Sequence, residues 1–168
     1  QRDNLTLHGY FQSEKYFEDY KDAIRKEYNF KNPKISSPID NTVSLHVRRG
    51  DYIQYPDHHP LCDLEYYHKA MKEFEGYNFI VFSNDKDWCK QNFKQKNVIV
   101  SEVNDAIEEL EMMSWCEHHI IANSTFSWWG AWLGHNEDKR IVAPKKWFGP
   151  AYKHYNPKDI YCEDWKIL

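Results

Sequence analysis

Short apolar runs alternate along the chain with stretches in which apolar residues recur every three to four positions. The apolar runs have the length of β-strands and are VSLHV (43–47), NFIVFS (78–83), NVIV (97–100), HHIIA (118–122) and RIVA (140–143). Amphipathic helical spacing occupies the intervals between them, at 63–74, 85–93, 105–115 and 125–135. Such alternation is typical of βαβ units, so the pattern predicts an α/β domain whose mostly parallel sheet is covered by helices on both faces.

The first forty residues follow a different pattern. In SEKYFEDYKDAIRKEY (13–28), aromatic and aliphatic residues recur near helical spacing, and Ser13 can cap the start of the helix. Residues 29–41 contain two prolines and several polar turn formers, which is typical of a linker. We therefore expect a helical segment and linker over 1–40, followed by one α/β domain over 41–168.

Polar groups stand directly after three of the predicted strands. They are Arg48–Asp51, Ser83–Asp85 and Asn123–Ser127. In open parallel sheets, ligands bind just beyond the carboxyl ends of the strands. The order of strands and polar groups thus predicts a binding site at this edge of the sheet.

The first of these groups reads HVRRGD (46–51). His46 and Arg48 are two positions apart on a strand, so they should share a face, with Arg49 on the opposite one. The planar fork of arginine binds phosphate oxygens in pairs, and Asp51 can orient an arginine or act as a general base. The alternative is a solvated RRGD turn with an internal Arg–Asp pair, and spacing alone does not separate the two.

The last group opens an aromatic helix, NSTFSWWGAWLG (123–134). Ser124 or Thr125 can cap that helix, which leaves its first N–H groups and its dipole facing the strand ends. This arrangement is a phosphate site to which Ser127 can add a hydroxyl. The alternative role of Ser124 and Thr125 is plain capping, and the tryptophans are expected to pack against the sheet.

A third candidate region is the acidic helix DAIEELEMMSWCEHH (105–119). Glu108, Glu109 and Glu111 lie opposite an apolar stripe, which is usually a solvated face. One carboxylate near the start of this helix can still accept hydrogen bonds from a base edge.

Composition narrows these possibilities. The net charge of −4 argues against a protein that coats nucleic acid, so an anion site must be a local basic pocket. Aromatic residues make up 17% of the chain, and such rings build cores but also line sugar and base pockets. The four cysteines are widely spaced without a CxxC, which favours reduced thiols. The histidine pairs lack metalloenzyme spacing, so no metal site is predicted. No GxGxxG, P-loop or GxSxG signature is present, so classical dinucleotide binding, P-loop binding and a serine nucleophile are unsupported.

Five motifs together resemble the α-1,2-fucosyltransferases of glycosyltransferase family 11, and the resemblance covers essentially the whole chain. They are LHGYFQSEKYF (7–17), HVRRGDY (46–52), FSND (82–85), ANSTFSWWGAWL (122–133) and APKKW (143–147). The resemblance implies an inverting, metal-independent transfer of L-fucose from GDP-fucose to a galactose 2-hydroxyl. It also implies that 41–168 is a Rossmann-like GDP-sugar-binding domain, similar to the C-terminal half of a GT-B glycosyltransferase.

Carried over to these positions, the resemblance puts Arg48 on the β-phosphate of the donor and His46 beside the nucleoside. Glu109 stands where family members often have Asp and becomes the expected guanine contact. Asp51 is the candidate general base, although a carboxylate paired with arginine is a poor base. The full set of expected substrate-binding residues is His46, Arg48, Arg49, Ser83, Asp85, Glu109, Asn123, Ser124, Thr125 and Ser127.

Family members usually begin with a glycine-rich segment resembling GGLGNQ, followed by an acceptor-binding half. By this resemblance we expect the sequence to begin near the end of that half, and we expect a donor-binding surface without a complete acceptor site. The expected partners are GDP-fucose and a galactose-terminated oligosaccharide or polysaccharide, with no nucleic acid. The expected setting is the cytoplasm, with peripheral association at the inner face of the membrane as an option. The alternatives are a GDP-sugar-binding domain without turnover and a phosphate-recognising protein unrelated to sugars.

Overall fold

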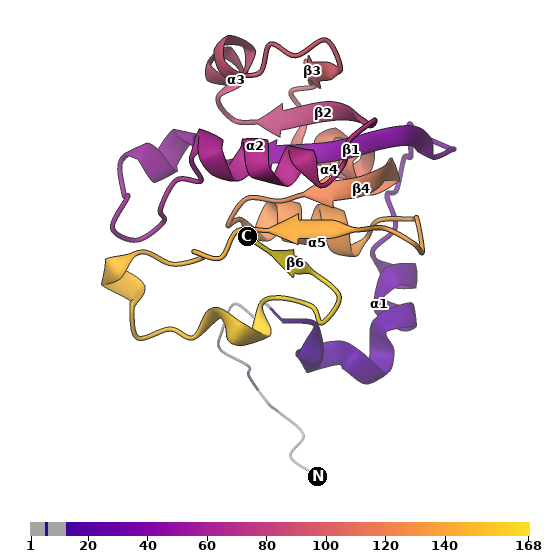
Figure 1. The fold of residues 1–168 in the computed structure, drawn as a ribbon. Helices are drawn as coiled ribbons and strands as arrows, with labels where there is room; N and C mark the ends of the chain where they lie inside the picture. The colour runs from indigo at the N-terminus through magenta and orange to yellow at the C-terminus, as the bar shows by residue number, and fades with distance from the viewer. Residues whose placement is uncertain (1–5, 7–12) are drawn as a thin grey trace.

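The structure, a computed structural model, describes residue 6 and residues 13–168, and a parallel sheet lies at its centre (Figure 1). Within these residues the sheet has six strands in the order β3-β2-β1-β4-β5-β6, and all neighbouring pairs are parallel. The strands are β1 (Ile39–Val47), β2 (Asn78–Ser83), β3 (Val98–Val100), β4 (Cys116–Ile120), β5 (Ile141–Ala143) and β6 (Lys166–Ile167). This strand order reverses between β1 and β4 and is that of a Rossmann fold. The predicted fold class is therefore confirmed.

Helices cover both faces of the sheet, with α2 in front of it and α4 and α5 behind it in the view of Figure 1. The α-helices are α1 (Lys21–Glu27), α2 (Leu64–Lys72), α3 (Lys86–Asn92), α4 (Ala106–Trp115) and α5 (Thr125–Trp132). Short 3₁₀ helices add η1 (Glu14–Tyr20), η2 (Gly50–Ile53), η3 (Pro150–Tyr152) and η4 (Pro157–Asp159). The sequence sets where three helices begin, because Asp63, Asp85 and Asp105 each accept a hydrogen bond from an N–H group of the following helix.

The core lies in layers on both sides of the sheet. On one side, Tyr67 and Phe74 from the α2 region pack with strand residues such as Leu45. On the other side, Trp128 and Trp132 of α5 are each only 2% exposed and pack against β5. Trp128 and Trp132 therefore take the core role predicted from the sequence, whereas Trp129 is half-buried and stacks on Phe17 and Tyr28.

The N-terminal segment is less regular than its periodicity predicts. Ser13 does accept a hydrogen bond from the N–H of Lys15, but the backbone leaves helical angles at Phe17 (φ −138°, ψ 27°). At this break the Phe17 ring packs against Trp132 at 5.2 Å and Trp129 at 5.9 Å between ring centroids. Packing against α5 thus accompanies the division of one predicted helix into η1 and α1.

Two strand boundaries differ from the apolar runs. β1 begins at Ile39, inside the stretch predicted as a linker, because Ile39 pairs with Cys116 of β4. β6 has only two residues and no apolar run of its own, and it forms by backbone pairing with β5. The division of the chain into 1–40 and 41–168 stays a prediction.

Candidate functional site

A cavity of about 570 Å³ opens at the carboxyl ends of β1 and β2, beside the point where the strand order reverses. We call it the arginine pocket. Its wall is built from the ends of β1 and β2, the start of α3, the start of α4 and the start of α5. The lining residues are His46, Arg48, Ser83, Asn84, Asp85, Lys86, Asp87, Val103, Asn104, Ala106, Glu109 and Phe126. Five of the residues predicted from the sequence thus meet in one cavity.

His46 reaches the arginine pocket from the end of β1. Its ring lies 5.5 Å from that of Phe126 and is 4% exposed. Burial, and secondly the charge of Arg48, lower the pKa of His46 to about 3, so the imidazole is neutral at pH 7. Its Nδ1 is buried and has no hydrogen-bond partner among the described residues. The neutral ring therefore offers an uncharged polar contact to a ligand.

Arg48 lines the same cavity, as the two-residue spacing from His46 predicts. Its guanidinium pairs with the Asp51 carboxylate at 2.7 Å and lies 5.3 Å from the ring centroid of Tyr52. The Nε of Arg48 is buried and finds no hydrogen-bond partner in the described part of the chain. An unsatisfied buried donor is costly, so this N–H group is suited to a bound anion.

Arg49 points elsewhere. Its Nε donates to the Asp85 carboxylate at 2.9 Å, and its guanidinium carbon lies 4.1 Å from the ring centroid of Trp88. The internal Arg–Asp pair of the RRGD turn is therefore made by Arg48 and Asp51, and Arg49 takes no part in it. Register explains the difference, because Val47 of β1 pairs with Ser83 of β2 and the residues after both strands therefore lie side by side.

Gly50 permits this close approach of the two strand ends. A Cβ atom on Gly50 would lie 2.1 Å from the side-chain nitrogen of Asn84, and the backbone of Gly50 has a positive φ of 26°. The Asn84 side-chain oxygen also accepts a hydrogen bond from the N–H of Arg49 at 3.0 Å. Asn84 thus fixes the turn that presents both arginines.

Ser83 and Asp85 line the pocket, and their side chains also make hydrogen bonds that stabilise its wall. The Ser83 hydroxyl accepts a hydrogen bond from the N–H of Asp85 at 2.9 Å. One Asp85 oxygen accepts from Arg49, and the other caps α3 by accepting from the N–H of Trp88 at 3.2 Å. Both carboxylate oxygens of Asp85 therefore already bind protein groups.

Glu109 brings a carboxylate from α4 into the pocket. Its Oε1 lies 3.3 Å from the Nζ of Lys86, an ion pair, but this buried oxygen makes no hydrogen bond with any described residue. Burial raises the pKa of Glu109, and the Lys86 charge partly opposes that rise. Its neighbour Glu111 departs from the solvated face expected for this helix, since it is 2% exposed and accepts from the N–H groups of Lys34 and Ile35.

Side chains in and after the Asn-Ser-Thr turn (123–125) make more hydrogen bonds within the protein than the sequence indicates. The Asn123 side chain donates to the carbonyls of Pro60 at 2.9 Å and Trp147 at 3.1 Å. The Ser127 hydroxyl donates to two carbonyls of the same turn. Ser124 occupies the N-cap position of α5, yet its side chain makes no capping bond with a described residue. Side-chain capping by Ser124 is thus not seen, and phosphate binding by this turn stays a prediction.

A second cavity, of about 1210 Å³, lies beside the first and is rich in aromatic side chains. Asn123 and Thr125 line this cavity, whereas the next residue, Phe126, lines the arginine pocket. Sequence reasoning missed the second cavity because its aromatic wall comes mostly from the irregular stretch 147–160. The high aromatic content was the one signal that pointed to it.

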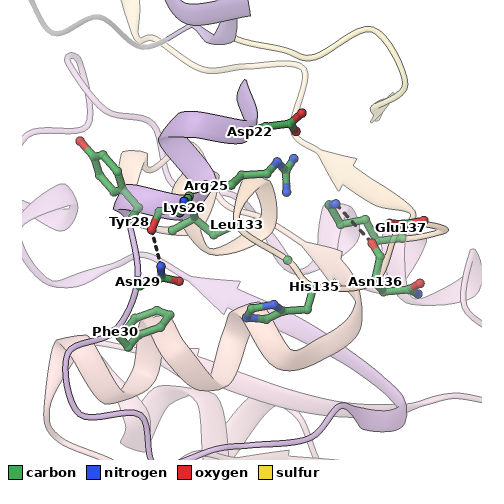
Figure 2. A pocket seen from close by; sticks show the side chains of 12 residues that line it. Asp22, Arg25, Lys26, Tyr28, Asn29, Phe30, Leu133, His135, Asn136 and Glu137 are labelled. Carbon is green, nitrogen blue, oxygen red and sulfur yellow. Dashed lines mark hydrogen bonds between the residues drawn. The ribbon is translucent and has the colours of Figure 1, made fainter. Parts of the chain in front are cut away.

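A third cavity, of about 590 Å³, lies between α1 and the end of α5, and Figure 2 shows the side chains that line it. Arg25 and Lys26 reach it from α1, and His135 stacks on Trp115 with 3.8 Å between ring centroids. This cavity lies at the edge of the sheet where the strands begin, away from their carboxyl ends. None of the site residues predicted from the sequence lines it.

The described residues contain neither a cluster suited to a metal ion nor a helix suited to span a membrane. In residue 6 and residues 13–168, no group of three or more His, Cys, Asp or Glu side chains is placed to hold a metal ion. Over the same residues, no helix has the length and apolar character needed to cross a membrane.

Comparison with known proteins agrees with this architecture. The family model "Glycosyl transferase family 11" matches residues 2–168. The chain is 38% identical over 179 residues to an alpha-1,2-colitosyltransferase of Escherichia coli, a match that covers 94% of this chain and 60% of that protein. It is 36% identical over 170 residues to the O-antigen biosynthesis glycosyltransferase WbnK of Escherichia coli, covering 88% and 56%.

A more distant relative is the galactoside alpha-(1,2)-fucosyltransferase 1 of Bos taurus, 26% identical over 179 residues, with 98% of this chain and 47% of that protein covered. The chain therefore spans about half to three-fifths of the length of these relatives. Its match to the family model extends over nearly every residue. The chain belongs to glycosyl transferase family 11.

Proposed function

We propose that the arginine pocket binds the GDP part of GDP-fucose, and that the protein transfers L-fucose to the 2-hydroxyl of a galactoside with inversion. The observation that carries the proposal is one cavity lined by both the Arg48 guanidinium, with its open Nε, and the Glu109 carboxylate. A diphosphate needs cationic donors, whereas the N–H groups on the pairing edge of guanine need an acceptor. The pocket offers one group for each end of GDP.

In the proposed reaction, the acceptor hydroxyl oxygen forms a bond to the anomeric carbon of fucose as the bond from that carbon to the β-phosphate oxygen breaks. The electron pair of the broken bond stays on the phosphate, and the acceptor hydroxyl loses its proton to a base. Arg48 would stabilise the negative charge that develops on the leaving GDP. We propose that this step needs no metal ion.

Asp51 fits a positioning role in this scheme. Its carboxylate is bound to Arg48 at 2.7 Å and is 55% exposed. We assign Asp51 first to holding the Arg48 guanidinium in place, and its role as the general base stays a prediction.

The choice of fucose as the transferred sugar rests on family membership. The names of two matched relatives share an α-1,2 linkage but differ in the sugar, colitose in one and fucose in the other. The acceptor proposed here, a galactoside, is the one named for the Bos taurus relative. A transfer assay with GDP-fucose and lactose therefore tests both halves of the proposal.

A second candidate is GDP-sugar binding without turnover, since the lining of the arginine pocket offers contacts for the donor but does not include Asp51, the candidate base. Titration calorimetry with GDP, next to assays of GDP-fucose hydrolysis and transfer in the presence of a chelator, separates the two. GDP binding with chelator-resistant transfer supports the first proposal, and binding without any turnover favours the second. Absence of GDP binding refutes both, and equal binding of UDP or ATP would indicate a general phosphate site.

A further inference from the structure

The second cavity carries an inference that rests on the proposed function. We call it the tyrosine pocket, after the six residues that form its working wall: Tyr52, His59, Thr125, Trp147, Tyr152 and Tyr155. We propose that the tyrosine pocket is a carbohydrate subsite that holds the galactose-terminated acceptor. The chain would then contribute to binding of the acceptor as well as to binding of the donor.

The position of the tyrosine pocket suits an acceptor. Tyr52 lines it, and the ring centroid of Tyr52 lies 5.3 Å from the guanidinium carbon of Arg48, which lines the arginine pocket. At the start of α5, Thr125 lines one pocket and Phe126 the other. The two cavities therefore meet at the Arg48–Tyr52 contact, where a phosphate-bound sugar and an acceptor would have to meet.

The chemistry of the wall is that of a sugar site. The Tyr155 ring lies 5.3 Å from Tyr152 and 5.5 Å from Phe148, between ring centroids, and Tyr155 is 53% exposed. Clustered, accessible aromatic rings give apolar faces on which the C–H faces of a pyranose stack, while their polar ends take hydrogen bonds. Asn156 and Asp159 add polar groups at the rim.

Charge favours a neutral ligand over a second phosphate. The Lys15 ammonium at the rim is bound to the Asp159 carboxylate at 2.5 Å. Burial, and secondly the neighbouring His58, lower the pKa of His59, so that imidazole is neutral at pH 7. The wall is mostly aromatic, and its Lys15 ammonium is already paired with Asp159, so the pocket is suited to an uncharged oligosaccharide.

The wall nearest the arginine pocket is also preformed. The Tyr52 hydroxyl donates to the carbonyl of Asn123 at 3.0 Å, and the Tyr52 ring stacks on His59 with 4.7 Å between centroids and 19° between planes. Asn123 is itself held by two further hydrogen bonds. A ligand meeting this wall would lose little binding free energy to ordering it.

The test uses lactose as the galactose-terminated probe and maltose as the glucose-terminated control, observed by ligand-detected NMR with the chain at saturating GDP. Lactose should bind, and Tyr155→Ala should weaken its binding about tenfold, since the ring supplies the stacking surface. Tyr155→Phe should stay close to the parent. Tyr20→Ala, which removes a 67% exposed ring outside both pockets, is the matched control and should change nothing.

GDP affinity, measured by calorimetry on each variant, keeps the two proposals apart. Normal GDP binding without lactose binding, or equal lactose loss in Tyr155→Ala and Tyr20→Ala, overturns the acceptor subsite and leaves the donor proposal intact. Maltose binding as strong as lactose overturns the assignment to galactosides. Absence of GDP binding instead overturns the proposed function, whatever lactose does.

Discussion

The two adjacent arginines give the sharpest prediction, because they look alike in sequence and differ in structure. Arg48→Ala removes the only one of the pair that lines the arginine pocket, together with a buried Nε that no described residue binds. A charge-assisted hydrogen bond contributes ~1.5–3 kcal/mol, which corresponds to roughly a 10- to 150-fold loss of GDP affinity. Arg48→Lys should recover only part of the loss, because an ammonium lacks the bidentate fork.

Arg49→Ala is the matched control. It removes the ion pair with Asp85 and the contact with the Trp88 ring, and neither Arg49 nor Trp88 lines the cavity. We expect this variant to lose about 1–2 kcal/mol of unfolding free energy, with less than about a threefold change in the Kd for GDP. Calorimetric titration with GDP, with urea unfolding of each variant, measures both quantities. Equal losses of GDP affinity in the two variants would refute the assignment of opposite roles.

Three further outcomes follow from single contacts. Glu109→Gln should weaken GDP about tenfold yet leave pyrophosphate binding unchanged in calorimetry, and an unchanged Kd for GDP would remove this carboxylate from the base contact. Gly50→Ala should lower the unfolding free energy by roughly 1–3 kcal/mol, and Asn84→Ala in the same chain should recover part of it, because the clash is with that side chain. Burial lowers the pKa of His46 and His119 to about 3, below the ordinary 6.5. Between about pH 3 and pH 6.5 these rings are neutral in the folded protein and protonated in the unfolded chain, so unfolding takes up protons. Stability should therefore fall by about 2 kcal/mol per histidine from pH 7 to pH 5 in urea unfolding, and a flat profile would contradict their burial as neutral rings.

Much of the sheet follows from local pattern. Buried strands read as apolar runs, and Asp63, Asp85 and Asp105 mark helix starts because a carboxylate satisfies the first N–H groups. His46 and Arg48 line the same cavity because side chains two positions apart on a strand point to the same face. These features depend on neighbours in sequence, which is why the sequence predicts them.

The features that sequence reasoning missed depend on long-range packing. Arg49 finds Asp85 only through the register of β1 against β2, and Glu111 is buried only because the segment carrying Lys34 and Ile35 runs over α4. The tyrosine pocket is assembled from loops with no hydrophobic period. The bracing bonds of Asn123 likewise join it to residues far away in sequence, Pro60 and Trp147, and its predicted substrate contact stays a prediction.

The proposed function depends above all on the arginine pocket holding the GDP moiety of the donor. A crystal structure of the chain with GDP would show where the nucleotide binds. We expect the β-phosphate within hydrogen-bond distance of the Arg48 guanidinium, and the guanine edge at the Glu109 carboxylate. GDP bound in the cavity between α1 and α5 shown in Figure 2, or a diphosphate held without Arg48, would contradict it.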